Sequence, residues 1–178
     1  MTNKPSSLNN KSIVFIGFMG VGKTTIGEAV AKKLNRDFID IDQEIEKEFQ
    51  ISTTEIFNIY GEKVFREKEK ALISEYCKCP EKIISVGGGA FLQDEIKNLC
   101  LSECIVIYLH LSWEAWKERL DLIIDSRPVL KGRTLEETEQ LFYTRQNIYA
   151  SHHLKVETDQ LTVDEITDRI VDLIQKTQ

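Results

Sequence analysis

The chain has 178 residues, and its 23 basic and 29 acidic side chains give a formal net charge of -6. A charge of this sign argues against general affinity for nucleic acid or for an anionic membrane, so we expect neither as a partner. No apolar run approaches the roughly 20 residues that cross a bilayer, and the N-terminus lacks the apolar core of a signal peptide. The length suits one compact α/β domain. We therefore expect a single-domain protein of the cytoplasm. For its assembly we expect a monomer, although length and charge do not themselves determine the oligomeric state.

The chain begins with a polar stretch over residues 1–10, which contains a proline, two serines and three asparagines. We expect this stretch to be a disordered tail and the folded domain to cover residues 11–178. Further on, four cysteines lack the Cys-x2-Cys spacing of a zinc site and the pattern of a small secreted disulfide framework. We expect reduced, structural thiols at Cys77, Cys79, Cys100 and Cys104.

Five short runs have the composition of β-strands, and helical patterns separate them. Alternation of strands and helices predicts right-handed crossovers and a parallel sheet with helices on both faces. In such sheets, ligands bind at the carboxyl ends of the strands. The expected strands cover residues 12–17, 37–41, 82–86, 104–109 and 154–157.

Three capping boxes predict helix starts. Each of Ser52, Thr134 and Thr162 is followed three residues later by a glutamate. Two segments are too long for a minimal strand–helix–strand repeat. Residues 42–79 hold about three helical pieces, which we expect to form a substrate-binding insertion. Residues 112–132 end in a charged loop, which we expect to form a lid.

The first expected strand leads into the pattern Gly-x4-Gly-Lys-Thr over residues 17–24, and a helical pattern follows. This arrangement aims backbone N–H groups and the positive end of a helix dipole at one point, which suits the phosphates of a nucleotide triphosphate. Lys23 would reach the β- and γ-phosphates, and the Thr24 hydroxyl would bind magnesium. The expected nucleotide contacts are Gly20, Val21, Gly22, Lys23, Thr24 and Thr25.

Two aspartates, Asp40 and Asp42, stand at the end of the second expected strand. Alternation along a strand would send both to the same side. Two carboxylates near bound phosphates suggest one partner for magnesium and one for an accepting hydroxyl. The alternative is that Asp42 only caps a helix starting at Gln43, and the spacing favours neither interpretation.

Two arginines lie in helical segments with apolar neighbours. Arg66 has Glu62 and Glu69 at helical spacing, so a surface ion pair is the simpler interpretation of that residue. Arg145 falls within the apolar stripe that includes Phe142. A guanidinium there must either form an internal salt bridge or face a ligand.

Three consecutive glycines, Gly87, Gly88 and Gly89, end the third expected strand. They remove side chains where a backbone would approach a ligand closely, although a flexible turn has the same composition. Around the second long segment lie further basic residues, which alone would be solvated charges. They are Arg119, Arg127 and Arg133, and Pro128 favours an extended backbone at Arg127.

The order and spacing of these residues resemble the shikimate kinase family over nearly the whole chain after the tail. The matching pattern comprises the loop of residues 17–25, Asp40-x-Asp42, Gly61-Glu62-x-x-Phe65-Arg66-x-x-Glu69, the three glycines, Arg127-Pro128-Val129-Leu130 and Arg145. The resemblance implies a three-layer P-loop kinase fold, in which a five-stranded parallel sheet of order 2-3-1-4-5 has helices on both faces. It also implies a kinase that uses ATP and Mg2+ to convert shikimate to shikimate 3-phosphate in aromatic amino-acid biosynthesis.

The resemblance also implies roles for individual residues. Thr24 would bind magnesium, with Asp40 acting through water, and Lys23 and Arg127 would contact the transferring phosphate. Arg119 would lie near adenine, although one extra residue separates it from Arg127. Shikimate would be held by Asp42, Arg66, Gly87, Gly88, Gly89 and Arg145, and the catalytic residues would be Lys23, Asp42 and Arg127.

The chain departs from the family pattern after Arg145, where it reads Gln146-Asn147-Ile148-Tyr149 in place of x-Pro-Leu-Tyr. The lost proline predicts a different end to that helix. Two other functions remain open from the sequence. One is a gluconate-type P-loop kinase, which Asp42, Arg66 and the three glycines disfavour. The other is a catalytically silent paralogue that binds nucleotide or a metabolite and regulates a partner.

Overall fold

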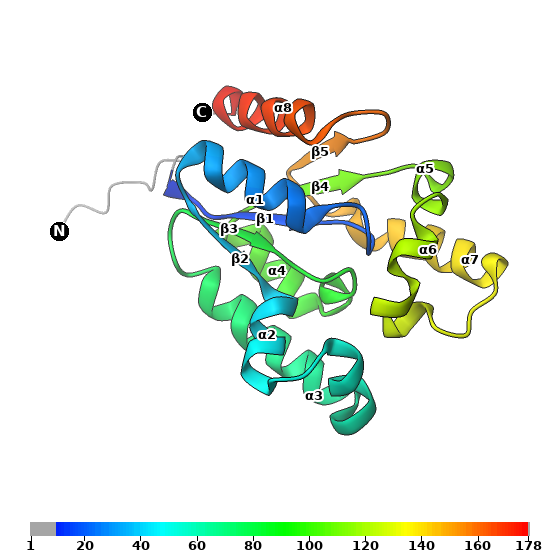
Figure 1. Cartoon of the computed structure of the whole chain (residues 1–178). Coiled ribbons are helices and arrows are strands. Elements are labelled where there is room, and N and C mark those ends of the chain that lie inside the picture. Colours follow the sequence, from blue (N-terminus) through cyan, green and yellow to red (C-terminus); the bar gives the residue numbers. More distant parts are fainter. Residues whose placement is uncertain (1–9, 178) are drawn as a thin grey trace.

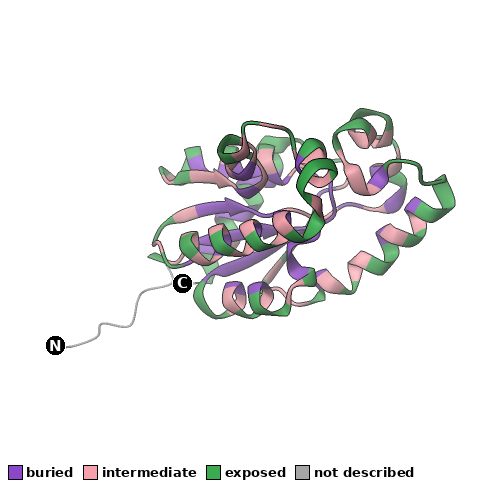
Figure 2. Cartoon of the chain, turned by 90° about the horizontal axis from the view of Figure 1, so that it is seen from below, coloured by how far each residue is buried: buried purple, intermediate pink, exposed green. Residues whose placement is uncertain are grey.

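The computed structural model of the chain describes residues 10–177 (Figure 1). The tail expected over residues 1–10 lies outside the described residues apart from Asn10. Five strands form one sheet of order β2-β3-β1-β4-β5, and every neighbouring pair is parallel. Figure 2 shows helices on both sides of the buried strands. The expected fold class and strand order are confirmed.

Each strand lies within one residue of the range expected at either end. β1 is buried along its whole length because it has a neighbour on each side in the sheet and helices on its faces. The strands are β1 (Ile13–Ile16), β2 (Asp37–Asp40), β3 (Lys82–Ser85), β4 (Ile105–His110) and β5 (Leu154–Glu157).

The three predicted capping boxes are present and begin α3, α7 and α8. In each, the Ser or Thr hydroxyl accepts a hydrogen bond from the backbone N–H of the third helical residue, which is a glutamate. The carboxylate of that glutamate accepts a hydrogen bond from the backbone N–H of the capping residue. α1 and α8 pack on each other, and α4 packs on β4 and α3. The helices are α1 (Lys23–Leu34), α2 (Ile41–Phe49), α3 (Thr53–Tyr76), α4 (Asp94–Glu103), α7 (Leu135–Gln146) and α8 (Val163–Lys176).

The first long segment contains α2 and α3, and α3 is interrupted at Gly61, whose φ of 84° and ψ of 163° are not helical. The segment therefore holds three helical pieces, as its pattern indicates. Both helices project beyond the sheet on the side where β2 ends (Figure 1). They can form one wall of a site at that end.

The second long segment is a chain of short helices that ends in a loop at Lys131 and Gly132. It consists of α5 (Trp113–Lys117), α6 (Leu120–Ile123) and the 3-10 turns η3 (Ile124–Ser126) and η4 (Pro128–Leu130), and we call it the α5–η4 segment. Arg127 between the two turns has φ -122° and ψ 101°, the extended backbone expected before a proline. Two further 3-10 turns, η2 (Ala90–Leu92) and η5 (Ile148–Ala150), complete the fold.

Cys77, Cys79, Cys100 and Cys104 are free thiols. Cys77, Cys100 and Cys104 are buried, and the sulfurs of Cys77 and Cys100 lie 3.7 Å apart. A hydrogen bond with a neighbouring thiol, Cys100 for Cys77 and Cys77 for Cys104, raises the pKa of both groups, and burial adds to the shift, so both carry protons at neutral pH. Among residues 10–177, no helix is both long and apolar enough to span a membrane.

Candidate active site

The loop after β1 turns sharply before α1, because Gly20 and Gly22 adopt φ angles of 80° and 102°. Gly22 is the N-cap of α1 and makes no side-chain cap. The first N–H groups of α1 have no acceptor inside their own helix and are available to a bound anion. The expected phosphate-binding geometry is therefore present in the backbone.

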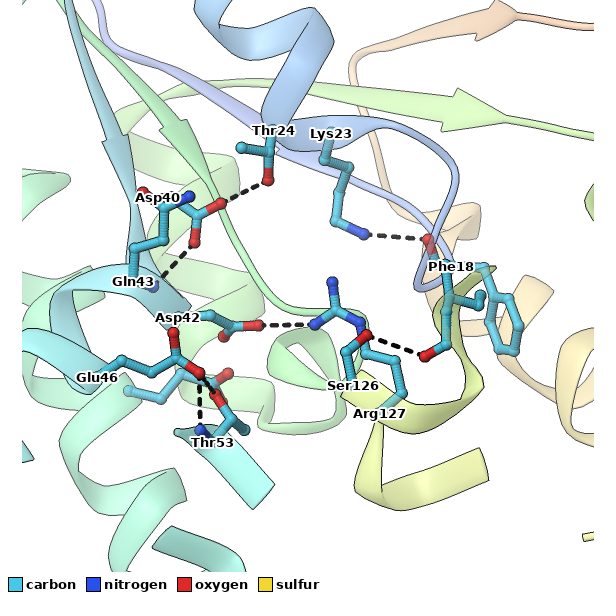
Figure 3. Close-up of polar contacts among 12 residues, drawn as sticks. Phe18, Lys23, Thr24, Asp40, Asp42, Gln43, Glu46, Thr53, Ser126 and Arg127 are labelled. Carbon is cyan, nitrogen blue, oxygen red and sulfur yellow. Dashed lines mark hydrogen bonds and ion pairs between the residues drawn. The ribbon is translucent and has the colours of Figure 1, made fainter. Parts of the chain in front are cut away.

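Lys23, the first residue of α1, folds back over this loop. Its Nζ donates to the carbonyl oxygens of Gly17 at 2.7 Å and Phe18 at 3.1 Å, and only 8% of the residue is exposed (Figure 3). Burial and the nearby Arg127 guanidinium lower the pKa of Lys23 to about 7, although Asp42 and Asp40 oppose the shift. An additional anion beside this ammonium would favour its charged form.

Asp40 and Asp42 differ in position from the expectation. β2 ends at Asp40, and α2 begins at Ile41 rather than at Gln43. Asp40 is the helix cap, since its Oδ1 accepts from the backbone N–H of Gln43 at 3.1 Å, while its Oδ2 accepts from the Thr24 hydroxyl at 2.6 Å. The strand-alternation argument and the alternative that Asp42 caps this helix are both wrong.

Asp42 lies in the first turn of α2 and reaches the α5–η4 segment. Its Oδ2 is 3.3 Å from Nη1 of Arg127, whereas its Oδ1 is buried without a hydrogen-bond partner. Burial raises the pKa of this carboxyl, and Arg127 opposes the shift. A carboxylate with one partnered and one free oxygen is placed to accept a hydrogen bond from a ligand hydroxyl.

Arg66 forms the ion pairs that its spacing predicts, with Nη1 2.8 Å from Oε1 of Glu69 and Nε 3.4 Å from Oε1 of Glu62. It does not lie on the surface, because only 18% of its side chain is exposed and that of Glu69 is wholly buried. Burial raises the pKa of Glu69 to about 7, against the opposing effect of Arg66. Arg66 is therefore paired with the buried Glu69, and its side chain remains partly exposed.

Gly89 lies under two guanidinium groups. A Cβ built on it would fall 2.5 Å from Nη2 of Arg66 and 3.1 Å from Nη1 of Arg145. Arg145 Nη1 donates to the carbonyl oxygen of Gly88 at 3.3 Å, and no ion pair of Arg145 occurs within residues 10–177. Burial lowers the pKa of Arg145, and Arg66 adds to the shift. Two converging guanidiniums have the chemistry to bind a carboxylate or another anion.

Two cavities meet at these residues. The larger has a volume of about 350 Å3, and its lining includes Gly20, Gly22, Lys23, Thr24, Thr25, Asp40, Asp42, Gly87, Gly88 and Arg127. The smaller has a volume of about 50 Å3, and its lining includes Asp42, Phe57, Arg66, Glu69, Gly87, Gly88, Gly89 and Arg127. Asp42 and Arg127 line both, so they stand where the two cavities join.

Three of the predicted residues line neither cavity. Val21 is buried, Arg119 donates to the carbonyl oxygen of Gly20 at 3.2 Å, and Arg145 lies behind the glycines. After Arg145, α7 ends at Gln146 and the chain continues as the turn η5. Tyr149 in that turn is buried and donates to the carbonyl oxygen of Gly88 at 2.5 Å.

Sequence reasoning missed Glu46 and Thr53. Thr53 lines both cavities, and its N–H and hydroxyl donate to Oε1 of Glu46 at 2.7 and 2.8 Å (Figure 3). Thr53 is the first residue of α3 and Glu46 belongs to α2, so this bond joins the two helices. Glu69 was identified only as a partner of Arg66. No sequence signal marks its complete burial, since its neighbours Gln93 and Gly87 come from a distant part of the sequence.

A parallel sheet of order 2-3-1-4-5, a Gly-x4-Gly-Lys-Thr loop after its central strand and an adjoining second cavity define a P-loop kinase for a small acceptor molecule. Comparison with known proteins agrees with this class. The family model described as shikimate kinase matches residues 19–175. The chain belongs to the shikimate kinase family and is an ATP-dependent phosphotransferase.

Named relatives cover almost the whole chain. The shikimate kinase of Oceanobacillus iheyensis is 55% identical over 94% of this chain and 92% of its own length. That of Bacillus licheniformis is 55% identical over 96% of this chain and 97% of its own. Among solved structures, shikimate kinase from Acinetobacter baumannii in complex with shikimate has a TM-score of 0.88 and 29% identity, covering 94% of each chain.

Proposed function

We propose that this chain transfers the γ-phosphate of ATP to the 3-hydroxyl of shikimate, giving shikimate 3-phosphate and ADP in aromatic amino-acid biosynthesis. One observation carries the proposal beyond family membership. Asp42 and Arg127 line both cavities, and Arg66 lines only the smaller one. ATP in the larger cavity would therefore present its γ-phosphate to an acceptor whose anionic group is held by arginine.

Shikimate has one carboxylate and three ring hydroxyls, and matching groups lie in and beside the smaller cavity. Arg66 and Arg145 would clamp the carboxylate, because two guanidiniums supply directed N–H donors to a planar anion. The backbone of the three glycines, residues 87–89, would lie against the ring. Asp42 would orient the 3-hydroxyl through its free Oδ1 and receive the hydroxyl proton.

Phosphoryl transfer passes through a loose transition state, so positioning and charge neutralisation supply most of the catalysis. The N–H groups of Gly20 and of residues 22–25 would hold the phosphates, and Lys23 would move from the loop carbonyls to the β- and γ-phosphates. Arg127 would stabilise the charge on the transferring group, and Asp42 need not be a strong base. Arg119 would place a face of its guanidinium near the adenine while one nitrogen holds Gly20.

Thr24 and Asp40 fit a magnesium site. Their oxygens are 2.6 Å apart, and both are hard oxygen donors of the kind that Mg2+ prefers. Asp40 is fixed by its second role as the cap of α2. We propose that Thr24 binds Mg2+ directly and Asp40 binds it through water. When bound, the ion would neutralise phosphate charge during transfer.

We further propose that residues 11–178 form one domain, with residues 42–79 as the substrate-binding insertion and residues 112–132 as a lid. Closure of the lid would bring Arg127 over the phosphates and exclude water, which limits ATP hydrolysis. The contacts of Arg127 with Asp42 support this assignment. A monomer in the cytoplasm remains our proposal for its assembly and location.

The position of the phosphate on the product tests the proposal. The protein is incubated with ATP, Mg2+ and shikimate, and the product is analysed by 1H–31P correlation NMR. We expect the phosphorus to couple to the proton on carbon 3 of the ring. Phosphorus on a different hydroxyl, or inorganic phosphate alone, would show that Asp42 does not select this hydroxyl.

A further inference from the structure

Four successive carbonyl groups of the phosphate-binding loop, those of residues 17–20, each accept a hydrogen bond from a side chain. Lys23 donates to the first two, at 2.7 and 3.1 Å. The indole Nε1 of Trp116 donates to the third at 2.6 Å, and Nη1 of Arg119 donates to the fourth at 3.2 Å. Trp116 is in α5 and Arg119 is the N-cap of α6, so half of these bonds come from the α5–η4 segment.

The two bonds from this segment determine which way the loop peptides face. In a trans peptide the carbonyl of one residue and the N–H of the next point in opposite directions. The carbonyl of Met19 points to the wholly buried Trp116, so the N–H of Gly20 points away from the core, toward the larger cavity that Gly20 lines. Arg119 fixes the next peptide, whose N–H on Val21 closes a turn on the carbonyl of Phe18 at 3.3 Å.

Packing reinforces these bonds. The rings of Phe18 and Trp116 meet edge to face, with centroids 5.0 Å apart. A Cβ on Gly20 would fall 2.6 Å from Cδ1 of Ile123 and 3.4 Å from the Trp116 indole nitrogen, so α5 and α6 lie directly against the loop. A buried carbonyl that loses its donor costs more than the hydrogen bond itself contributes, because it has left water and found no replacement. The loop conformation therefore depends on the indole N–H.

Arg127 belongs to the same segment and follows α6 and η3 in the sequence. Ile123, which contacts the loop, is the last residue of α6, and the N–H of Arg127 bonds to the carbonyl of Ile124 at 3.4 Å. A shift of α6 relative to the loop would therefore shift Arg127 relative to the phosphates. Loop and arginine are held by one continuous piece of chain.

We propose that Trp116 and Arg119 are positioning residues, which hold the phosphate-binding loop in its nucleotide-binding conformation and make nucleotide affinity depend on the α5–η4 segment. The inference rests on the proposed function only in that the loop binds nucleotide phosphates. Neither the Trp116 indole nor its position in α5 belongs to the family pattern seen in the sequence. These two residues therefore affect the affinity for the nucleotide and not the affinity for the acceptor.

The chain offers a matched control in Trp113. It stacks on Trp116 with ring centroids 5.4 Å apart and is almost as buried, but its indole makes no hydrogen bond to the loop within residues 10–177. Trp116→Phe and Trp113→Phe remove the same atoms from the same aromatic cluster. Only the first removes the donor to Met19.

The test compares these variants in the full chain by steady-state kinetics and by calorimetric titration with ATP in the absence of acceptor. We expect Trp116→Phe to raise the KM and the Kd for ATP about tenfold, with the KM for shikimate changed less than about twofold. Trp113→Phe should leave all three within about twofold. Equal shifts in the two variants, or an equal rise in both KM values of Trp116→Phe, would overturn the proposal.

A second replacement guards against loss of packing. Exchange of Trp116 for 3-benzothienylalanine keeps the bicyclic ring and replaces the N–H with sulfur, so it should weaken ATP binding although the packing of the ring is retained. Normal ATP affinity in this protein would overturn the proposal. The calorimetric arm contains no acceptor, so it tests the loop even if the wild-type protein fails to phosphorylate shikimate, and the two failures are distinguishable.

Discussion

Gly89 offers the sharpest test of the arginine pair that we assign to the acceptor. In Gly89→Ala the new Cβ would lie 2.5 Å from Nη2 of Arg66, whereas ordinary contacts begin at 3.4 Å, so the guanidinium must move by about 1 Å. Arg145 must also move, since its Nη1 would be 3.1 Å away. The backbone of Gly89, with φ -103° and ψ 0°, is accessible to alanine, so the fold itself is not strained.

A displacement of about 1 Å in a group that orients a ligand can cost up to about 10²-fold in rate. We expect Gly89→Ala to raise the KM for shikimate about 10- to 100-fold, equivalent to about 1.4–2.7 kcal/mol. The KM for ATP should stay within about twofold, because Gly89 does not line the larger cavity. Steady-state kinetics with each substrate varied in turn measures both values.

Gly88→Ala serves as the matched comparison. Its Cβ would approach the backbone nitrogen of Met19 at 3.1 Å and no arginine atom closer than 3.6 Å, so a shift of only about 0.3 Å relieves it. We expect a smaller rise in the KM for shikimate than in Gly89→Ala. If Gly89→Ala bound shikimate normally, or if the two variants were equally impaired, the arginine pair would not hold the acceptor.

Three further predictions concern charged groups of the site. Arg127→Ala should lower kcat more than it raises the KM for shikimate, because a lid residue acts mainly after closure; an unchanged kcat in a folded variant would place Arg127 outside the reaction. Asp40→Asn should require more Mg2+ and be partly restored by excess ion, whereas Asp42→Asn should lose about 10²-fold in kcat at any Mg2+ concentration. A similar Mg2+ response in both variants would refute this division of roles. The pKa of Glu69 is about 7 in the folded protein, against an ordinary value of 4.5, so folding takes up a proton between pH 4.5 and pH 7. The free energy of unfolding therefore contains the full contribution of this group below pH 4.5 and loses it as the pH rises through about 7. Urea unfolding from pH 4 to pH 8 should show this loss in the wild type and not in Glu69→Gln; parallel pH profiles would contradict the assignment.

Much of the fold follows from local sequence. The capping boxes at Ser52, Thr134 and Thr162 determine helix starts because the cap and its glutamate lie within one turn. The phosphate-binding loop is equally local, since its glycines, lysine and threonine are contiguous. Alternation of strand and helix patterns indicates the parallel sheet, and the strand order came only from the family resemblance.

The site is less predictable where it depends on element boundaries and packing. Treating Asp40 and Asp42 as residues of one strand failed because β2 ends at Asp40, where capping α2 competes with continued pairing. Helical spacing correctly paired Arg66 with Glu69 but could not show that the pair is buried. The contacts of Trp116 with Met19 and of Glu46 with Thr53 join separate elements, so no short pattern reveals them.

The rate of ADP formation with three alternative additions tests the central claim most directly. The protein is assayed with ATP and Mg2+ in the presence of shikimate, of gluconate, or of no acceptor. We predict ADP formation that depends on shikimate and exceeds the other two rates by at least about 10²-fold, since in the proposed site the rigid ring of shikimate spans from the arginine pair, Arg66 and Arg145, to Asp42. Equal rates with gluconate, or no ADP formation with shikimate despite ATP binding, would contradict the account.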